Sequence, residues 1–230
     1  IMSKKRIKKK HTSESINISN GSFIKTSRVI RPRVLVDPSV YADIRNITLK
    51  SGQNETGGLL LGEKKQDGEN YLVLVKKATG PGGNAEYSPC HFSPDIEHYK
   101  SEMRSHLYRN GLVYVGEWHK HPGSFDQPSC TDLNTMKEIT SNDNTKDVVT
   151  IITTVSSSNF EKKPGACVKT DFFYYQRGMD DFEKVNPEII TMVPLRKRSK
   201  IIKKINLDAD YILSLFKDDT KSLSIKGQIT

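Results

Sequence analysis

The sequence contains no long hydrophobic run. Its runs richest in apolar side chains, Leu59–Leu61 and Val148–Ile152, are far shorter than the roughly 20 residues of a membrane-spanning helix, so we expect no membrane protein. The first residues are basic but no apolar stretch follows them, so we expect no secretory signal. Only three cysteines are present, without a zinc-finger spacing, which favours a reduced, cytoplasmic protein over a disulfide-stabilised one.

Acidic residues are missing from two segments. Residues 1–10 carry six lysines or arginines and residues 196–204 carry six more. Because the net charge of the chain is +9, subtracting these twelve charges leaves about −3 for all other residues. Basic arms can bind nucleic acid or an acidic surface, but here no aromatic residues alternate with the lysines as in a single-strand binder. We therefore expect solvated arms and no nucleic-acid partner.

Composition divides the 230 residues into three parts. Residues 1–28 are rich in Lys, Ser, Asn and Thr, which predicts a basic, flexible N-terminal arm. Residues 29–195 contain most of the apolar segments and are long enough for one domain. Residues 196–230 read as a basic linker and a short amphipathic C-terminal helix.

The central part predicts a mixture of helices and strands. Apolar spacing of three and four residues predicts helices over 37–50, 94–109 and 131–140. Stretches rich in β-branched and aromatic residues predict strands at 34–36, 59–61, 71–78, 112–119, 148–155, 168–176 and 189–193. Because this order is not a regular alternation of strand and helix, we expect an α+β fold around a central sheet.

The segment that indicates chemistry runs from His119 to Asp132. Alternate residues of a strand point to the same face, so His119 and His121 would present two imidazoles about 6.6 Å apart at Cα. Pro122 ends the strand, and Asp132 falls in the first turn of the predicted helix. Two imidazoles and one carboxylate suit Zn²⁺ and leave a fourth position for water.

Two further residues are candidates for the reaction. A zinc-bound water has its pKa lowered to about 7 and needs a base, for which Glu55 is the candidate, although spacing alone does not bring it near. Ser129 offers a hydroxyl that can donate to a developing oxyanion. Each residue also has a structural alternative: the histidines as half-buried strand residues, Asp132 and Ser129 as helix caps, and Glu55 as a loop carboxylate.

The combined pattern resembles the JAMM (MPN/JAB) zinc metalloproteases. That family has an upstream Glu, then His-Ser/Thr-His, seven residues, Ser, two residues and Asp. Here the triplet His119–His121 is followed by seven residues, Ser129, two residues and Asp132. The segment Glu55-Thr56-Gly57-Gly58 matches the upstream Glu of the family.

The resemblance implies a role for each matched residue. His119, His121 and Asp132 would bind zinc, Glu55 would act as general acid/base through the bound water, and Ser129 would stabilise the oxyanion. It also implies an MPN/JAB-like fold, similar to that of cytidine deaminases, with a mixed central sheet flanked by helices. The reaction of the family is hydrolysis of isopeptide or peptide bonds at the C-terminus of ubiquitin-like proteins, which either removes the modifier or matures its precursor.

Lys120 departs from this pattern, because the family has Ser or Thr between the histidines. We expect its side chain on the opposite face of the sheet, where it does not disturb metal binding, although a positive charge near the cleft could alter substrate preference. A nucleobase deaminase, which is another kind of zinc hydrolase, is excluded because it requires His-x-Glu and Pro-Cys-x-x-Cys.

A narrower resemblance is to the bacterial JAB proteins of conjugation operons, through Gly116-Glu117-Trp118-His119 and Phe92-Ser93-Pro94-Asp95. It implies a cytoplasmic enzyme of an antiphage system, with a ubiquitin-like protein or its conjugate as substrate and activating and conjugating enzymes as partners. The alternative is a non-catalytic MPN scaffold that binds protein partners, or nucleic acid through its basic arms. All the matched residues are present, which counts against the scaffold. The sequence indicates neither the oligomeric state nor the identity of the modifier.

Overall fold

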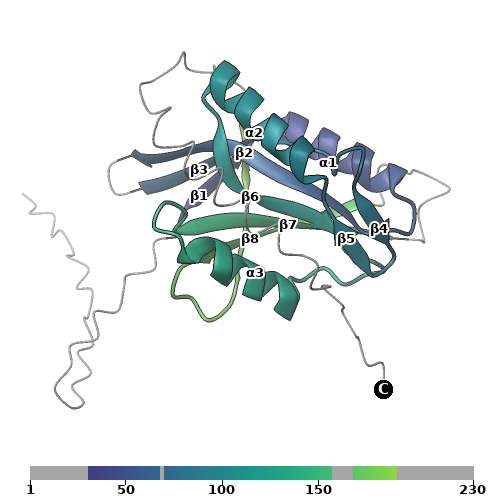
Figure 1. The fold of residues 1–230 in the computed structure, drawn as a ribbon. Coiled ribbons are helices and arrows are strands. Elements are labelled where there is room, and N and C mark those ends of the chain that lie inside the picture. The colour runs from purple at the N-terminus through teal and green to yellow at the C-terminus, as the bar shows by residue number, and fades with distance from the viewer. Residues whose placement is uncertain (1–30, 68–69, 157–167, 191–230) are drawn as a thin grey trace, which may run out of the picture.

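The computed structural model describes residues 31–67, 70–156 and 168–190 (Figure 1). The arms expected at 1–28 and 196–230, with the C-terminal helix, lie outside these residues, as does the end of the strand predicted at 189–193. In the described part of the chain, no helix is long and apolar enough to cross a membrane.

Ten strands and three helices are present in the described residues. In chain order they are β1 (Arg33–Val36), α1 (Pro38–Lys50), β2 (Thr56–Asp67), β3 (Asn70–Ala78), β4 (Glu86–Ser88), β5 (His91–Ser93), α2 (Ile96–Asn110), β6 (Val113–Lys120), α3 (Cys130–Ser141), β7 (Asp147–Val155), β8 (Val168–Gln176), β9 (Glu183–Val185) and β10 (Glu188–Ile189). The three predicted helices are confirmed, with ends that differ from the prediction by at most two residues. The short strands β4, β5 and β9 were not predicted.

Eight of the strands form one sheet in the order β10-β1-β3-β2-β6-β7-β8-β9, and β4 pairs with β5 in a separate hairpin. The sheet is mixed: β6, for example, is antiparallel to β2 and parallel to β7. The expected α+β fold with a central mixed sheet is therefore confirmed. Its two middle strands are β2 and β6; β6 carries His119 and ends one residue before His121.

The sheet curls until its two edges approach each other. β9 ends at Val185 and β10 begins at Glu188, although these strands lie at opposite ends of the strand order. Residues three positions apart can be separated by at most about 11 Å, whereas a flat sheet of eight strands would separate its edges by about 34 Å. An ion pair of 2.9 Å between Arg31 Nε, just before β1, and Glu183 Oε1 of β9 also links these two sides of the sheet.

Two hydrophobic clusters cover the two faces of this sheet. Successive residues of β2 divide between them: Leu60 belongs to the first cluster, and Leu59 and Leu61 belong to the second. Helix α1 supplies Val40 and Ile44 to the first cluster, whereas α2 and α3 supply residues to the second. The two faces of β6 therefore point toward different helices, which decides the surroundings of each motif residue.

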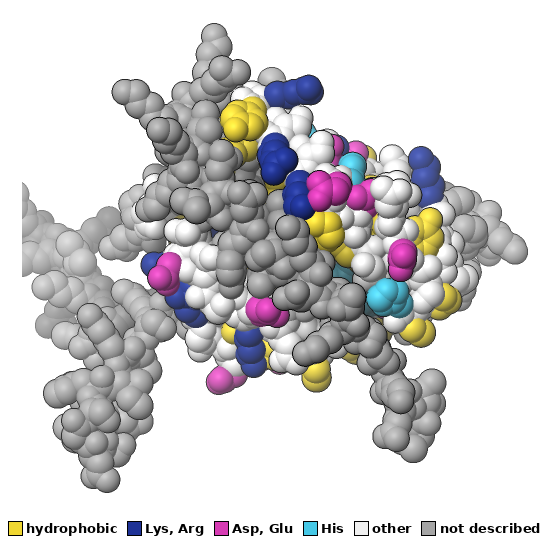
Figure 2. Space-filling view, viewed as in Figure 1, with side chains coloured by type: hydrophobic (Ala, Val, Ile, Leu, Met, Phe, Trp, Pro, Cys, Tyr) yellow, Lys and Arg dark blue, Asp and Glu magenta, His cyan; other side chains and the backbone are white. Residues whose placement is uncertain are grey.

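Side-chain caps explain where the helices begin. The Asp37 carboxylate accepts a hydrogen bond of 2.9 Å from Ser39 N, with proline in the first turn as predicted. In α2 the Asp95 carboxylate caps the helix by accepting from His98 N, so the helix begins at Ile96. On the face shown in Figure 2, acidic and basic side chains of the described residues are interspersed, as expected if the excess basicity lies in the arms.

Candidate metal centre

The end of β6 presents the two histidines on one face of the sheet. Gly57 of β2 lies opposite His119 in the ladder, and a Cβ added at Gly57 would lie 3.1 Å from the Cβ of His119. Trp118 points the other way, into the cluster that contains α1, and its indole Nε1 donates to the Thr79 carbonyl at 2.9 Å. The alternation predicted for this strand is confirmed.

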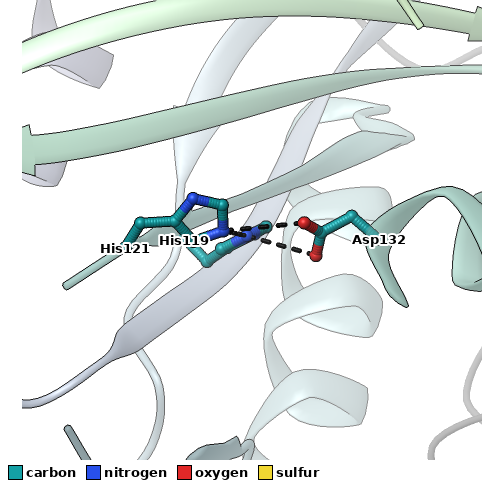
Figure 3. Close-up of side chains that lie close together, drawn as sticks. All are labelled: His119, His121 and Asp132. Carbon is teal, nitrogen blue, oxygen red and sulfur yellow. Dashed lines mark hydrogen bonds and ion pairs between the residues drawn. The ribbon is translucent and has the colours of Figure 1, made fainter. Parts of the chain in front are cut away.

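Three side chains of the motif converge (Figure 3). The Nε2 atoms of His119 and His121 lie 2.7 Å apart. Asp132 Oδ1 lies 3.3 Å from Nε2 of His119, and Asp132 Oδ2 lies 3.5 Å from Nε2 of His121. One nitrogen of each imidazole and one carboxylate oxygen all fall within 4.8 Å of one another. Such a set can hold one metal ion.

A capping box at the start of α3 brings Asp132 to the histidines. Ser129 is the N-cap: its hydroxyl oxygen accepts from Asp132 N at 3.2 Å, and the Asp132 carboxylate accepts in return from Ser129 N. The structural alternative foreseen for both residues is thus present in the fold. It does not exclude the metal-binding alternative, because the same carboxylate also faces both imidazoles.

The imidazole of His121 is oriented for metal binding by its other nitrogen. Nδ1 lies 3.0 Å from the carbonyl oxygen of Phe125, which can only accept, so Nδ1 is the donor and Nε2 is the nitrogen that faces His119 and Asp132. A backbone carbonyl in this position is a usual partner of metal-binding histidines. The ring of Phe125 stacks on the imidazole with centroids 5.3 Å apart. Two nitrogens and one carboxylate oxygen therefore fit Zn²⁺.

Charge interactions within the group alter its acid–base properties. Burial alone would raise the pKa of the Asp132 carboxyl, but His119, His121 and Ser129 outweigh burial and hold that pKa well below its usual range. Burial alone would lower the pKa of His119, and the Asp132 carboxylate reverses this effect and raises it. In the protein without metal, the group therefore favours an ionised carboxylate.

The pairing of β2 with β6 brings Glu55 to the same place. Thr56 pairs with Lys120, so Glu55 lies one residue beyond this pair, on the same face as Gly57 and the histidines. Burial raises the pKa of the Glu55 carboxyl above its ordinary value, and charged His119 and His121 act in the opposite direction. Sequence spacing had left open whether Glu55 approaches the other residues, and this pairing brings it there.

The hairpin of β4 and β5 forms one wall beside Glu55. Glu55 N donates to the Ser88 carbonyl at 2.9 Å, and a Cβ at Gly57 would lie 2.9 Å from Cε1 of Phe92. Only glycine leaves room for this close approach of the hairpin to the strand. The exposed Tyr87 of β4 lies opposite Phe92 in the hairpin.

Glu117 is a further acidic residue beside the group, and sequence reasoning missed it. It lies two residues before His119 on the same face of β6, and the Tyr114 hydroxyl donates to its Oε1 at 3.0 Å. Burial raises the pKa of the Glu117 carboxyl to about 7. The apolar residues around Glu117 are distant in sequence, so no local signal marked it.

Comparison with known proteins gives the family. Residues 37–166, which are more than half of the chain, match the family model described as prokaryotic homologs of the JAB domain. The chain belongs to this family. The matched residues of the JAB domain include Glu55 and the whole segment from His119 to Asp132.

Two individual proteins are also similar to this JAB domain. A protein named CD-NTase/cGAS isopeptidase, from Enterobacter hormaechei subsp. hoffmannii (strain UCI 50), is 29% identical over 109 residues. The match covers 47% of this chain and 59% of that relative, so it spans less than two thirds of the relative's length. The solution structure of a protein from Desulfitobacterium hafniense has a TM-score of 0.46 and 21% identity, covering 68% of this chain and 91% of that one.

Proposed function

We propose that this chain is a zinc-dependent isopeptidase or peptidase that releases a ubiquitin-like protein from its conjugates or matures its precursor. The observation that carries the proposal is the convergence of His119, His121 and Asp132, with Glu55 on the same face. We assign catalysis to the domain at 29–195, with the basic segments as extensions, and place the enzyme in the bacterial cytoplasm.

The residues divide the reaction between them. His119, His121 and Asp132 would hold the zinc ion, which would supply the Lewis acidity that makes water acidic enough to react at neutral pH. The Glu55 carboxylate takes up the proton of the attacking water and returns it to the leaving amine nitrogen. The Ser129 hydroxyl donates to the carbonyl oxygen as negative charge develops there. The raised pKa of Glu55 suits such a two-way transfer.

The surroundings of the site suit an extended polypeptide tail. Two aromatic side chains that are about half exposed lie next to it: Phe125 stacks on His121, and Tyr87 lies on the hairpin that bonds to Glu55. Aromatic side chains of this kind gain from covering by a flexible chain. The name of the Enterobacter relative points to a conjugate of a CD-NTase-like enzyme as the substrate to test. The antiphage conjugation system implied by the narrower sequence resemblance is part of our proposal.

Metal content tests the site without any substrate. We expect about one zinc per chain in the parent and clear loss in Asp132→Ala, because one of three protein ligands is removed. Asp126→Ala is the matched control: it removes a carboxylate from the loop before α3 that pairs with Lys169 and not with the histidines. Absence of zinc from the parent, after purification without chelator and attempted reloading, would instead favour the non-catalytic scaffold.

Activity then tests the role of Glu55. Using a conjugate that the parent cleaves, Glu55→Gln should lower kcat by roughly 10²- to 10⁴-fold while zinc content is kept. Glu86→Gln, an exposed glutamate on the neighbouring hairpin, should cleave at the parental rate. Full activity of Glu55→Gln would show that the proton transfer has been assigned to the wrong residue.

A further inference from the structure

Lys120, between the two histidines, is a buried lysine with its ammonium beneath the chain that leads to Glu55. Its exposed fraction is 3%. The ammonium Nζ donates to the Asn54 carbonyl at 3.0 Å, to the Gly52 carbonyl and to the Ser51 hydroxyl at 3.3 Å. The side chain therefore points away from the cleft, and its charge does not meet the substrate directly.

These acceptors belong to the end of helix α1 and to the turn that follows. Ser51 is the C-cap of α1, and Gly52 has a left-handed backbone with φ of +62°. The acceptors are the Ser51 hydroxyl and two carbonyls of the turn, so Lys120 acts on the turn and not on the carbonyls of the helix itself. A cation near the C-terminal end of a helix is also favoured by the helix dipole.

Burial of this ammonium is expensive, because all three of its hydrogen-bond acceptors are neutral. Lysine is almost never fully buried unless it is paired. Burial lowers the pKa of Lys120, and the negative charge of Glu55 acts against that lowering. The carboxylate of Glu55 is thus the nearby charge that makes the buried ammonium less costly.

The contacts of Lys120 lie on both sides of Glu55 in the chain. The residues that it binds, Ser51, Gly52 and Asn54, lie within the four positions before Glu55. Thr56, immediately after Glu55, pairs with Lys120 itself in the ladder. One residue therefore holds the chain on both sides of the glutamate. Further support comes from the bond of Glu55 N to the Ser88 carbonyl and from the bond of Asn54 N to the Ser51 carbonyl.

We propose that Lys120 is a positioning residue that fixes segment 51–54 and thereby holds the carboxylate of Glu55 beside His119 and His121. The proposal rests on the function assigned to Glu55 above. A shorter Ser or Thr side chain at this position could not span from β6 to the turn after α1.

Lys120→Met in the full-length protein tests the proposal, because it keeps the length and burial of the side chain and removes the donor. We expect amide hydrogen exchange of residues 52–56 to accelerate roughly tenfold or more. We also expect kcat for the cleaved conjugate to fall about 10- to 100-fold with KM and zinc content unchanged, since small misplacement of a reacting group has effects of this size. Lys76→Met is the matched control, since Lys76 is also buried but pairs with Glu63 farther along β2.

Hydrogen exchange and kcat can each refute the proposal. Exchange at 52–56 and kcat that both match the parent would overturn the proposal, as would a fall in kcat that Lys76→Met reproduces. If Lys120→Met does not fold, Lys120→Gln, which can still donate to one carbonyl, should show a smaller change in the same two quantities, and no change would refute it. If the parent cleaves no conjugate, the proposed function fails, but the exchange measurement still decides whether Lys120 fixes the segment.

Discussion

Glu117 offers a stability prediction whose sign and size follow from its surroundings. Its carboxyl lies on the buried side of β6, and burial raises its pKa from 4.5 to about 7. The folded protein then keeps a proton that the unfolded chain has already released. Because the folded pKa is raised, the stabilising effect is fully present below pH 4.5 and is lost as the pH rises toward about 7.

The magnitude follows from the shift. One pKa unit corresponds to about 1.4 kcal/mol, so the rise from 4.5 to about 7 amounts to about 3 kcal/mol. Glu117→Gln cannot ionise, yet its amide oxygen still accepts from the Tyr114 hydroxyl. The free energy of unfolding of the variant minus that of the parent should therefore increase by about 3 kcal/mol between pH 4.5 and about 7.5.

Urea unfolding of the chelator-treated proteins, repeated in steps of pH, measures this difference, and contributions from groups that do not interact with Glu117 cancel in it. Glu138→Gln is the control, because Glu138 lies on the exposed side of α3. Its difference from the parent should stay flat. A difference for Glu117→Gln that is equally flat would refute the reasoning, because the buried carboxyl would then ionise as it does in the unfolded chain.

Two further predictions concern the framework. A Cβ at Gly58 would lie 2.0 Å from the Thr79 carbonyl oxygen, so Gly58→Ala should lower the free energy of unfolding by about 1–3 kcal/mol or more. Gly83→Ala is the control in the same urea assay. It should be tolerated, because a Cβ at Gly83 meets no atom within 4 Å. Asp37→Ala removes the cap on Ser39 N and should cost about 1 kcal/mol, measured by thermal or urea unfolding; Asp37→Asn should restore most of it, and equal losses in both would argue against the cap.

The parts of the site that are local in sequence could be predicted, and the parts that depend on pairing could not. The alternation that puts both histidines on one face needs only one strand, and the short return to Ser129 and Asp132 needs only one loop. The approach of Glu55 depends on the register of β2 against β6, whose partners Thr56 and Lys120 are far apart in sequence. The catalytic role of Glu55 stays a prediction.

The elements that escaped prediction are those with too few residues to show a period. β4 and β5 have three residues each, so alternation cannot be recognised in them, although they form the wall beside Glu55. The face of Lys120 was predicted correctly, but its partners were not, because strand alternation gives a direction and not a neighbour. The raised pKa of Glu117 likewise depends on burial by distant residues.

The near-closure of the curled sheet has a consequence for how the chain reaches this structure. β1, which opens the described domain, pairs with β10, which ends it, through partners such as Leu35 and Glu188. Contacts of such large sequence separation are slow to form. During synthesis, β1 leaves the ribosome long before β10. The ladder between these two strands can form only after residues 188–189 have been made. The last ladder of the domain therefore forms only when nearly the whole domain has left the ribosome.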